Sequence, residues 1–418
     1  MQKKLLAVAV AGALALPGAA LAASSVTITG FFKVSFASIK VSPQPPPGSA
    51  PGTAGGRNSQ DRVQDESSRI YFRVVEDLGG GLQALGQVDM RFTNDQGALS
   101  AAGANWVGLR SKSWGSIKAG RADIHYIYTE DQTYSRGGTL KAVNTSIIGF
   151  SNSGANAIAN NSRTPNLLMW DSPNWKGFTI KAAYSSNPYG VEADIASGNS
   201  SGYAWNLAPQ YNAKNWGIGY SYWQGRNDGA GFGTTTTIQC TGVGVPAPGC
   251  VGTGPLVITN AAGQVKTRGD RVNAHYQWGG FRLGFVWDSA KITDAGAGTP
   301  TAILPVGVGS EISKRDAWSI PARYSWGKHN VFGHYSVAKD DKATVYANTQ
   351  TGAKMFAIGY SYSLSKRTKA ALTYAKISND IGARYNLFTS AGGLGSPDSA
   401  VAPGQDPSTF ALTLTHSF

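Results

Sequence analysis

The chain of 418 residues is 15% charged, contains 53 glycines and carries a formal net charge of +13. Ordinary soluble proteins have roughly 25% charged residues and about 7% glycine, so this composition excludes a disordered chain and a coiled coil. Mean hydropathy is −0.20, and after the N-terminal segment no apolar run reaches the roughly 20 residues of a membrane helix. The class that is left is a β-rich protein.

The first segment of the chain has the pattern of a secretory signal. Lys3 and Lys4 precede an apolar stretch that begins at Leu5, and residues 20–22 have the A-x-A pattern of a cleavage site. A single helical anchor, the alternative, needs a longer apolar span and a stop-transfer flank. We therefore expect a signal peptide at 1–22 and a mature, still basic chain at 23–418.

From residue 25 to the C-terminus, apolar side chains recur at every second position over nine to fourteen residues, and each such run ends in a turn. The alternation is clearest at 216–222, 281–287, 356–364 and 410–418, where the opposite face carries mainly small and polar residues. This period of two predicts β-strands with one face in an apolar environment and the other in contact with water.

Short turns and long connections alternate along the chain, which is typical of an up-and-down barrel in an outer membrane. One strand before residue 41, a pair on each of seven short turns and one last strand give 16 strands, and an even number closes without exposed edges. We expect a single domain. The short turns lie near 77–81, 113–115, 174–177, 213–215, 279–280, 327–328 and 365–366, and the long connections near 41–66, 124–162, 226–263, 294–310 and 380–407.

Tryptophan gives an independent indication of a membrane rim. Five of the 11 tryptophans lie beside short turns, and an amphipathic indole prefers the boundary between lipid and water. The alternative is that aromatic residues merely flank turns, as they do in many β proteins. The five residues are Trp114, Trp175, Trp216, Trp278 and Trp326.

If the apolar face meets lipid, the other face lines an aqueous interior. Placing Val34 outward turns Lys33 inward, and placing Phe72 outward turns Arg73 inward. Basic groups outnumber acidic ones on this face, and a positive potential between low-dielectric walls raises the local concentration of anions. The same alternation sends these other charges inward: Arg69, Asp89, Arg91, Arg110, Lys118, Lys181, Arg271, Arg282, Asp288 and Arg323.

The connection at 124–162 differs in composition from a linker, because it contains three tyrosines and the acidic pair Glu130 and Asp131. A long ordered segment in a compact domain is usually functional. Folded into a wide barrel, it would narrow the bore and place its acids opposite basic residues of the wall. A solvated external flap is the alternative.

Other chemistry is absent or local. The two cysteines, Cys240 and Cys250, are expected to form a disulfide in an oxidising compartment and to stiffen one loop. The five histidines are dispersed, with no ligand-like spacing to either sulfur, so no metal site is expected. No nucleophile elbow, zinc motif or phosphate loop is present, so we expect neither an enzyme nor a cofactor, and no nucleic-acid partner.

In the order and spacing of several motifs, the sequence resembles the Gram-negative trimeric general porins, particularly the type found in β-proteobacteria. The resemblance covers the whole mature chain. The motifs are SVTITG at 25–30, SRIYFR at 68–73, EDLGGGL at 76–82, WVGL at 106–109, AGR at 119–121, RTPN at 163–166, WDSP at 170–173 and the terminal Phe418.

The resemblance implies a 16-stranded homotrimeric channel whose third external loop folds inward. By motif position, it implies a constriction with a basic row of Arg69, Arg121 and Arg163 opposite Glu130 and Asp131. Lys33 is a fourth candidate base by alternation alone.

The sequence departs from the family pattern at several positions. Lys33 stands where many members have an acid, and Met169 where many have another arginine. Alternation from Ile117 turns Arg121 outward, so its inward assignment requires a bulge or a strand end. Pro321, inside an apparent strand, also suggests a bulge.

From the strand alternation, the basic inner face and the resemblance, we expect a channel for passive diffusion of small hydrophilic solutes and ions across the outer membrane of a Gram-negative bacterium, with a preference for anions. Three alternatives stay open: a substrate-specific porin for organic acids or phosphate, a non-conducting barrel that serves as an adhesin or anchor, and a secreted soluble β protein.

Overall fold

The computed structural model describes residues 24–42, 59–101, 103–125, 144–148, 163–188, 202–227, 235–239, 255–259, 265–294, 311–343, 350–387, 401 and 404–418. The expected signal peptide, both cysteines, Glu130 and Asp131 lie outside these residues. None of the helical segments in the described residues has the length and apolarity of a membrane span.

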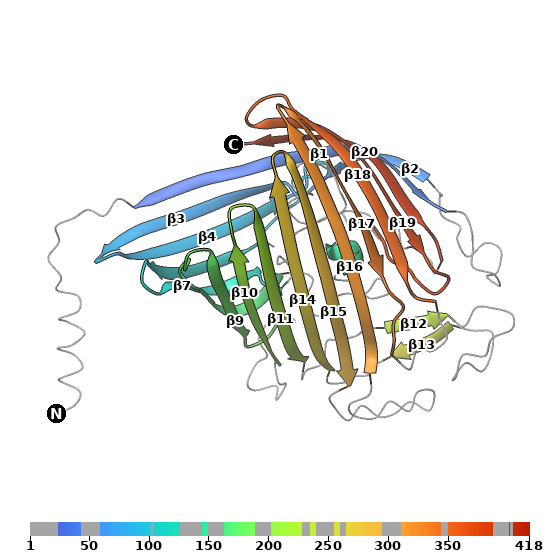
Figure 1. Cartoon of the computed structure of the whole chain (residues 1–418), viewed down its shortest axis with the longest axis horizontal. Coiled ribbons are helices and arrows are strands. Elements are labelled where there is room, and N and C mark those ends of the chain that lie inside the picture. The colour runs from blue at the N-terminus through green and yellow to red at the C-terminus, as the bar shows by residue number, and fades with distance from the viewer. Residues whose placement is uncertain are drawn as a thin grey trace.

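The strands form one antiparallel sheet that closes on itself, since the last strand, β20, pairs with β1 (Figure 1). The barrel strands in chain order are β1 Ser25–Val41, β2 Ser59–Asp65, β3 Arg69–Gly79, β4 Leu82–Phe92, β5 Leu99–Ser100, β6 Asn105–Ser111, β7 Gly115–Asp123, β8 Arg163–Asp171, β9 Phe178–Ser185, β10 Tyr203–Asn212, β11 Trp216–Asn227, β14 Val265–Trp278, β15 Phe281–Asp294, β16 Glu311–Trp326, β17 His329–Ala338, β18 Ala353–Ser363, β19 Thr368–Asn379 and β20 Pro407–Ser417.

These 18 segments make 16 barrel strands, as the sequence predicts. β2 and β3 both pair with β1 and are halves of one strand, separated by a kink at residues 66–68 where Ser67 has a φ of 74°. β5 and β6 both pair with β4 and form a second divided strand. The wall therefore closes with no unpaired edge.

All seven predicted short turns join neighbouring strands at one end of the barrel. The longer connections differ from expectation in two places. β2 occupies part of the segment expected to be the loop 41–66, and β12 Thr235–Gln239 pairs with β13 Pro255–Thr259 as a separate hairpin within 226–263. The alternation of short and long connections is confirmed, and these two long connections carry strands of their own.

With the exception of the short segments β2 and β5, the barrel strands present apolar rows outward, which is the central prediction from the sequence. On β1, Phe36 is 55% exposed while Ala37 is 0% exposed, and on the paired strand β20 the same contrast separates Leu412 (52%) from Ala411 (0%). A continuous exposed apolar surface of this kind is unfavourable in water and favourable in contact with the hydrocarbon of a membrane. A filled interior lined by these rows is excluded.

Four of the five tryptophans beside short turns are exposed, and they lie at the end of the barrel that carries these turns. Trp175 stacks on Phe178, and Trp326 stacks on Tyr324 and on the imidazole of His329. The arrangement is that of an aromatic girdle at one rim, where amphipathic rings meet both lipid and water.

Two irregularities were expected from the sequence, and the structure contains one of them. The register between β7 and β8 shifts between Gly120 and Ala122, which is the bulge that the assignment of Arg121 requires. Pro321, in contrast, pairs with His334 in an unshifted register, so the bulge expected there is wrong. Pairing with β15 is only interrupted around Pro321, because proline has no N–H to donate.

The third external connection enters the barrel. Its described central part, the π-helix η2 Asn144–Ile148, contacts β16, β17 and β18, and Ile147 and Ile148 are fully buried. They belong to an apolar cluster with Phe332, Met355 and Ile377 of the opposite wall. The loop is therefore held inside by an apolar contact as well as by polar ones.

Candidate functional site: the charged inner wall

Four arginines form a continuous row across the inner wall from β3 to β8. Arg69 and Arg91 are direct cross-strand partners on β3 and β4. Arg91 lies within electrostatic range of Arg69 and of Arg121, and Arg121 lies within the same range of Arg163. The three arginines chosen by motif are thus brought together, and Arg91 fills the gap between two of them.

Arg69 is held by aromatic rings rather than by an acid. Its guanidinium carbon lies 5.0 Å from the centre of the Phe31 ring, its Nε donates to the Ser67 carbonyl at 3.0 Å and its Nη1 to the Tyr71 hydroxyl at 3.1 Å. A ring face attracts the cation without neutralising it. Arg69 therefore adds a positive charge to the row with aromatic, hydroxyl and carbonyl groups as its nearest contacts.

The other members of the row have two carboxylates among the described residues. Asp89 accepts two hydrogen bonds from Arg91, at 2.8 and 3.0 Å, and Asp123 lies 3.6 Å from the Nε of Arg163. The Nε of Arg121 is buried with no hydrogen-bond partner in the described part of the chain. Four arginines against two aspartates leave an excess of positive charge along this wall.

Lys33 has the inward orientation that alternation predicts, half-buried between exposed Phe32 and partly buried Val34. It lies next to the kink between β2 and β3, where its N–H donates to the Ser68 hydroxyl at 2.9 Å. Glu66, a buried acid at this kink, accepts hydrogen bonds from Ser35 at 2.8 Å and Gln64 at 2.6 Å.

Sequence reasoning missed Glu66 and its neighbour Asp65, because it assigned them to a loop. The signal that could have found them is the acid pair placed just before the motif at residues 68–73.

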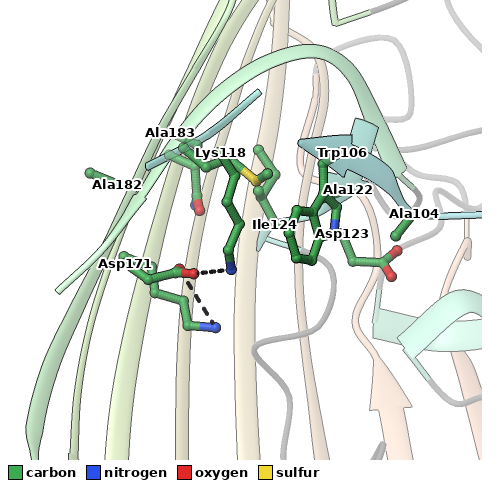
Figure 2. Close-up of a pocket in the computed structure, with 12 residues that line it drawn as sticks. Ala104, Trp106, Lys118, Ala122, Asp123, Ile124, Asp171, Ala182 and Ala183 are labelled. Carbon is green, nitrogen blue, oxygen red and sulfur yellow. Dashed lines mark hydrogen bonds and ion pairs between the residues drawn. The ribbon is translucent and has the colours of Figure 1, made fainter. Parts of the chain in front are cut away.

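A second group of charges lies deeper along the wall from β7 to β9 (Figure 2). Lys118 Nζ is 2.5 Å from Asp171 and Lys181 Nζ is 3.9 Å from the same carboxylate. The Lys118 ammonium also lies 4.8 Å from the centre of the Trp106 ring. Both lysines were predicted to face the interior, whereas Asp171 was not selected.

Three of the predicted interior arginines donate hydrogen bonds to glutamine side chains. Arg73 donates to Gln87 at 2.9 Å, Arg110 to Gln83 at 2.6 and 3.0 Å, and Arg282 to Gln277 at 3.4 Å. Arg323 lies directly across the strand pair from Arg282. A neutral amide orients a guanidinium without neutralising it, so the amide contacts of Arg73 and Arg110 leave two positive charges on the inner face.

Arg271 and Asp288 also face inward, but they are buried and do not line open space. Asp288 bridges Arg271, at 2.8 Å, and Arg315, at 3.0 Å, and all three side chains are 1% exposed. Alternation along β16 could have found Arg315, since it shares the inward face with Ser313 and Ala317, which are both buried. These charges serve as an ion-paired cluster rather than as lumen charges open to solutes.

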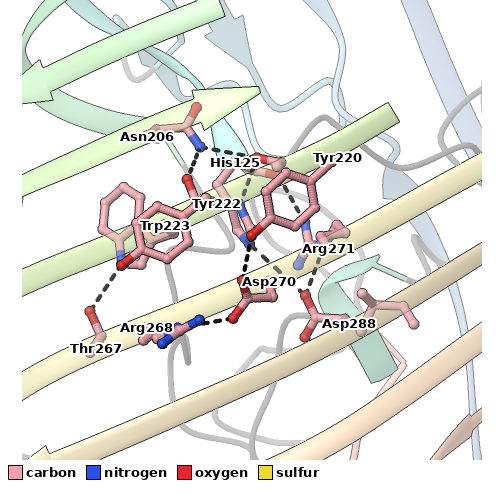
Figure 3. A network of polar contacts seen from close by, with 12 residues as sticks. His125, Asn206, Tyr220, Tyr222, Trp223, Thr267, Arg268, Asp270, Arg271 and Asp288 are labelled. Atoms are coloured by element: carbon pink, nitrogen blue, oxygen red, sulfur yellow. Dashed lines mark hydrogen bonds and ion pairs between the residues drawn. The ribbon is translucent and has the colours of Figure 1, made fainter. Parts of the chain in front are cut away.

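This cluster binds both described parts of the third loop. Arg271 donates to the carbonyl of His125 at 2.9 Å, close to where the loop begins (Figure 3), and Arg315 donates to the carbonyls of Ile147 and Ile148. Asp288 joins the two arginines, so one carboxylate organises the attachment of two loop segments to the wall. Charge-assisted hydrogen bonds of this kind are the strong ones.

His125 completes the attachment at the start of the loop. Its Nδ1 lies 2.8 Å from the Ser221 hydroxyl, and its ring is fully buried beside Trp223. Burial, and then the charge of Arg271, lowers the pKa of His125 well below its usual range. The imidazole is therefore neutral at physiological pH.

The sequence matches the family model described as Gram-negative porin over residues 7–382. The chain belongs to the Gram-negative porin family. An outer membrane porin protein of Bordetella pertussis is 28% identical over 337 residues, which are 74% of this chain and 77% of that protein. The closed barrel, the outward apolar rows and the inward third loop are the structural basis of this membership.

Solved structures of outer-membrane proteins share the fold at low identity. The anion-selective porin from Comamonas acidovorans covers 95% of this chain and 100% of its own, with a TM-score of 0.66 and 17% identity. The trimer form of OmpT of Vibrio cholerae covers 95% and 100%, with a TM-score of 0.58 and 12% identity. DcaP of Acinetobacter baumannii covers 94% and 97%, with a TM-score of 0.58 and 10% identity.

This porin is therefore an outer-membrane protein that forms a water-filled channel for passive diffusion of small hydrophilic solutes. Its family and fold are those of channel proteins.

Proposed function

We propose that this porin is a general diffusion channel that prefers anions, and that the arginine row on β3, β4, β7 and β8 provides the preference. The observation that carries the proposal is the excess of guanidinium groups over carboxylates in this row among the described residues. In a narrow space with low-dielectric walls, that excess concentrates anions and repels cations.

The same residues account for a size limit. The third loop occupies part of the bore, and the row of Arg69, Arg121 and Arg163, with Lys33 as a fourth base, faces the remaining opening. Glu130 and Asp131, in the part of the loop outside the described residues, supply the opposite sign in this proposal. A transverse field between acids and bases orients dipolar solutes as they pass. Transport of this kind needs no cofactor, metal or catalytic group.

Two further features belong to the proposal. The porin from Comamonas acidovorans is named anion-selective, which supports the proposed ion preference. One OmpT structure is of a trimer form, and we propose that this porin likewise assembles as a homotrimer in lipid. We also propose that residues 1–22 are removed as a signal peptide, that residues 23–418 form one domain, and that Cys240 and Cys250 are joined by a disulfide.

The deciding experiment is the reversal potential of the purified porin in a planar lipid bilayer under a KCl gradient. The wild type should give a potential of the sign that chloride selectivity requires. Replacing Arg69, Arg121 and Arg163 together by glutamate should reverse that sign, since the row then changes by six charges.

The control is the double variant Arg110→Glu and Arg282→Glu, which changes four charges at interior positions away from the row and should cause a shift well below two-thirds of that of the triple variant. An unchanged potential in the triple variant would show that the row does not face the ion path.

A further inference from the structure

A cavity of about 200 Å³ lies in the inner wall below the start of the third loop (Figure 2). It is formed by neighbouring strands from β6 to β10 and is open toward the interior of the barrel. It is distinct from the arginine row: no arginine lines it, and only Asp123 of its lining contacts the row, through Arg163. Its lining residues include Trp106, Lys118, Met169, Asp171, Lys181 and Ala183.

One end of this cavity is cationic. The ammonium groups of Lys118 and Lys181 both lie within 4 Å of the single carboxylate of Asp171. The three side chains are 20%, 38% and 28% exposed, so a solute in the channel can reach them. Asp123, the other acid in the lining, lies 3.6 Å from Arg163 and is occupied by that ion pair.

The rest of the cavity is mostly apolar, with Asn206 and Asp123 as its polar residues, and contains one aromatic ring. Ala122, Ile124, Met169 and Ala183 line it together with Trp106, whose ring centre is 4.8 Å from Lys118 Nζ. Sites that combine a mostly apolar lining with a few convergent polar groups are typical of small-molecule binding. A ligand that fits both parts has one anionic end and a flat apolar body.

We propose that this cavity is a binding site for small aromatic monocarboxylates on their way through the channel. The carboxylate joins the two lysine ammonium groups, and the ring lies in the apolar part against Trp106. A hydrated inorganic anion would not use the apolar walls, and an organic cation would meet two positive charges. The proposal depends on conduction by the porin but not on its ion preference.

The test uses benzoate as the probe in planar bilayers containing the wild-type porin. Added benzoate should lower the conductance in a saturable manner, whereas benzyl alcohol, its neutral analogue, and acetate, which lacks the ring, should lower it far less. The half-blocking concentration, at which benzoate halves the conductance, measures the affinity of the site. Equal effects of benzoate and acetate would overturn the proposal, because the site would then recognise charge alone.

Two variants with opposite expected effects on benzoate affinity make the test more specific. Lys181→Gln should raise the half-blocking benzoate concentration about fivefold to tenfold, because one ammonium contact is lost. Asp171→Asn should lower it by a similar factor, since the competing carboxylate is neutralised. The control is Arg110→Gln, which removes an exposed interior cation elsewhere on β6 and should leave the value unchanged.

The outcomes separate this proposal from the anion preference. If Lys181→Gln and Asp171→Asn leave the benzoate effect unchanged, the site is wrong even when the reversal potential shows anion selectivity. If the variants shift the benzoate effect as expected in a porin with no anion preference, the site stands and the arginine row is what fails.

Discussion

Arginines face the interior from two opposite walls of this barrel, and their surroundings give them different roles. On β3 to β8, arginines lie side by side with few acids, and Arg69 is held by aromatic rings. On β14 to β16, Arg271 and Arg315 share Asp288 under the third loop and are almost fully buried. The comparison teaches that inward orientation alone does not make a charge part of the ion path. The acids and loop carbonyls that surround the charge distinguish the two walls.

The physical basis of the difference is desolvation. A buried ion is tolerated only when a partner and hydrogen bonds replace its hydration, which Asp288 and the loop carbonyls provide for Arg271 and Arg315. The row from Arg69 to Arg163 is less uniformly buried, since Arg91 and Asp89 are buried whereas Arg163 and Asp123 are about one-fifth exposed, and its guanidinium groups outnumber its described carboxylates. One wall therefore attaches the loop, and the other carries the anion preference that we propose.

The largest effect is expected from Asp288→Asn, which leaves two buried guanidinium groups without their shared charge. Removal of one partner from a buried ion pair costs about 3–5 kcal/mol. The variant should lose its folded form at a clearly lower temperature, measured by the heat-dependent mobility of unboiled samples on gels. Asp171→Asn is the control. Its carboxylate is partly exposed, so this variant should change the free energy of unfolding by less than about 1 kcal/mol.

A second prediction concerns pH and the start of the third loop. His125 has a lowered pKa in the folded state, so below about pH 6.5 the unfolded chain binds a proton that the folded chain does not. Stability from this group is present above that pH and is lost as the pH falls. Between about pH 8 and pH 5 the loss should reach about 2 kcal/mol.

The matched variant for this prediction is His125→Gln, which keeps a polar partner for Ser221. Thermal transitions at the two pH values should differ less in the variant than in the wild type. The same pH dependence in both proteins would show that other groups cause it.

The third prediction addresses the opposite wall. Arg121→Gln removes one charge from a row of like charges, so we expect a change in unfolding free energy of less than about 1 kcal/mol. Its reversal potential in a KCl gradient should nevertheless shift toward zero. A large loss of stability without a shift in potential would place Arg121 with the buried cluster instead of the row.

The smallest effect is expected from salt on the wild type. The Debye length falls from about 10 Å at 0.1 M to about 3 Å at 1 M, so concentrated KCl screens the row from passing ions. At a fixed concentration ratio across the bilayer, the anion preference should weaken as both solutions become more concentrated. A preference that does not depend on salt would indicate specific binding of the anion.

Much of the fold was predictable because a strand has a period of two and one of its faces must meet lipid. The alternation around Phe36 and around Leu412 gave the strands, the outward face and, with the short turns, the count of 16. Of the kinked second strand, the half β3 was predicted and the half β2 was missed, since β2 follows a segment rich in proline and glycine and lacks a continuous apolar row. The bulge at Arg121 was predicted from a conflict between motif and alternation, whereas proline at 321 proved compatible with a regular strand.

The candidate site was predictable in part. Alternation assigned Lys118, Lys181 and Arg271 to the interior, but it gave no means of separating the exposed lysines from the buried arginine. Arg315 and His125 were missed, because their role depends on a loop that returns to strands far away in the sequence.

The sequence by itself determined the closed barrel, the apolar outer surface and the basic interior, because these follow from local alternation and from composition. Only the tertiary structure decided which interior charges meet water and which attach the third loop. That decision depends on contacts between segments more than 100 residues apart, such as Arg271 with His125, and no local pattern encodes the burial that such contacts create.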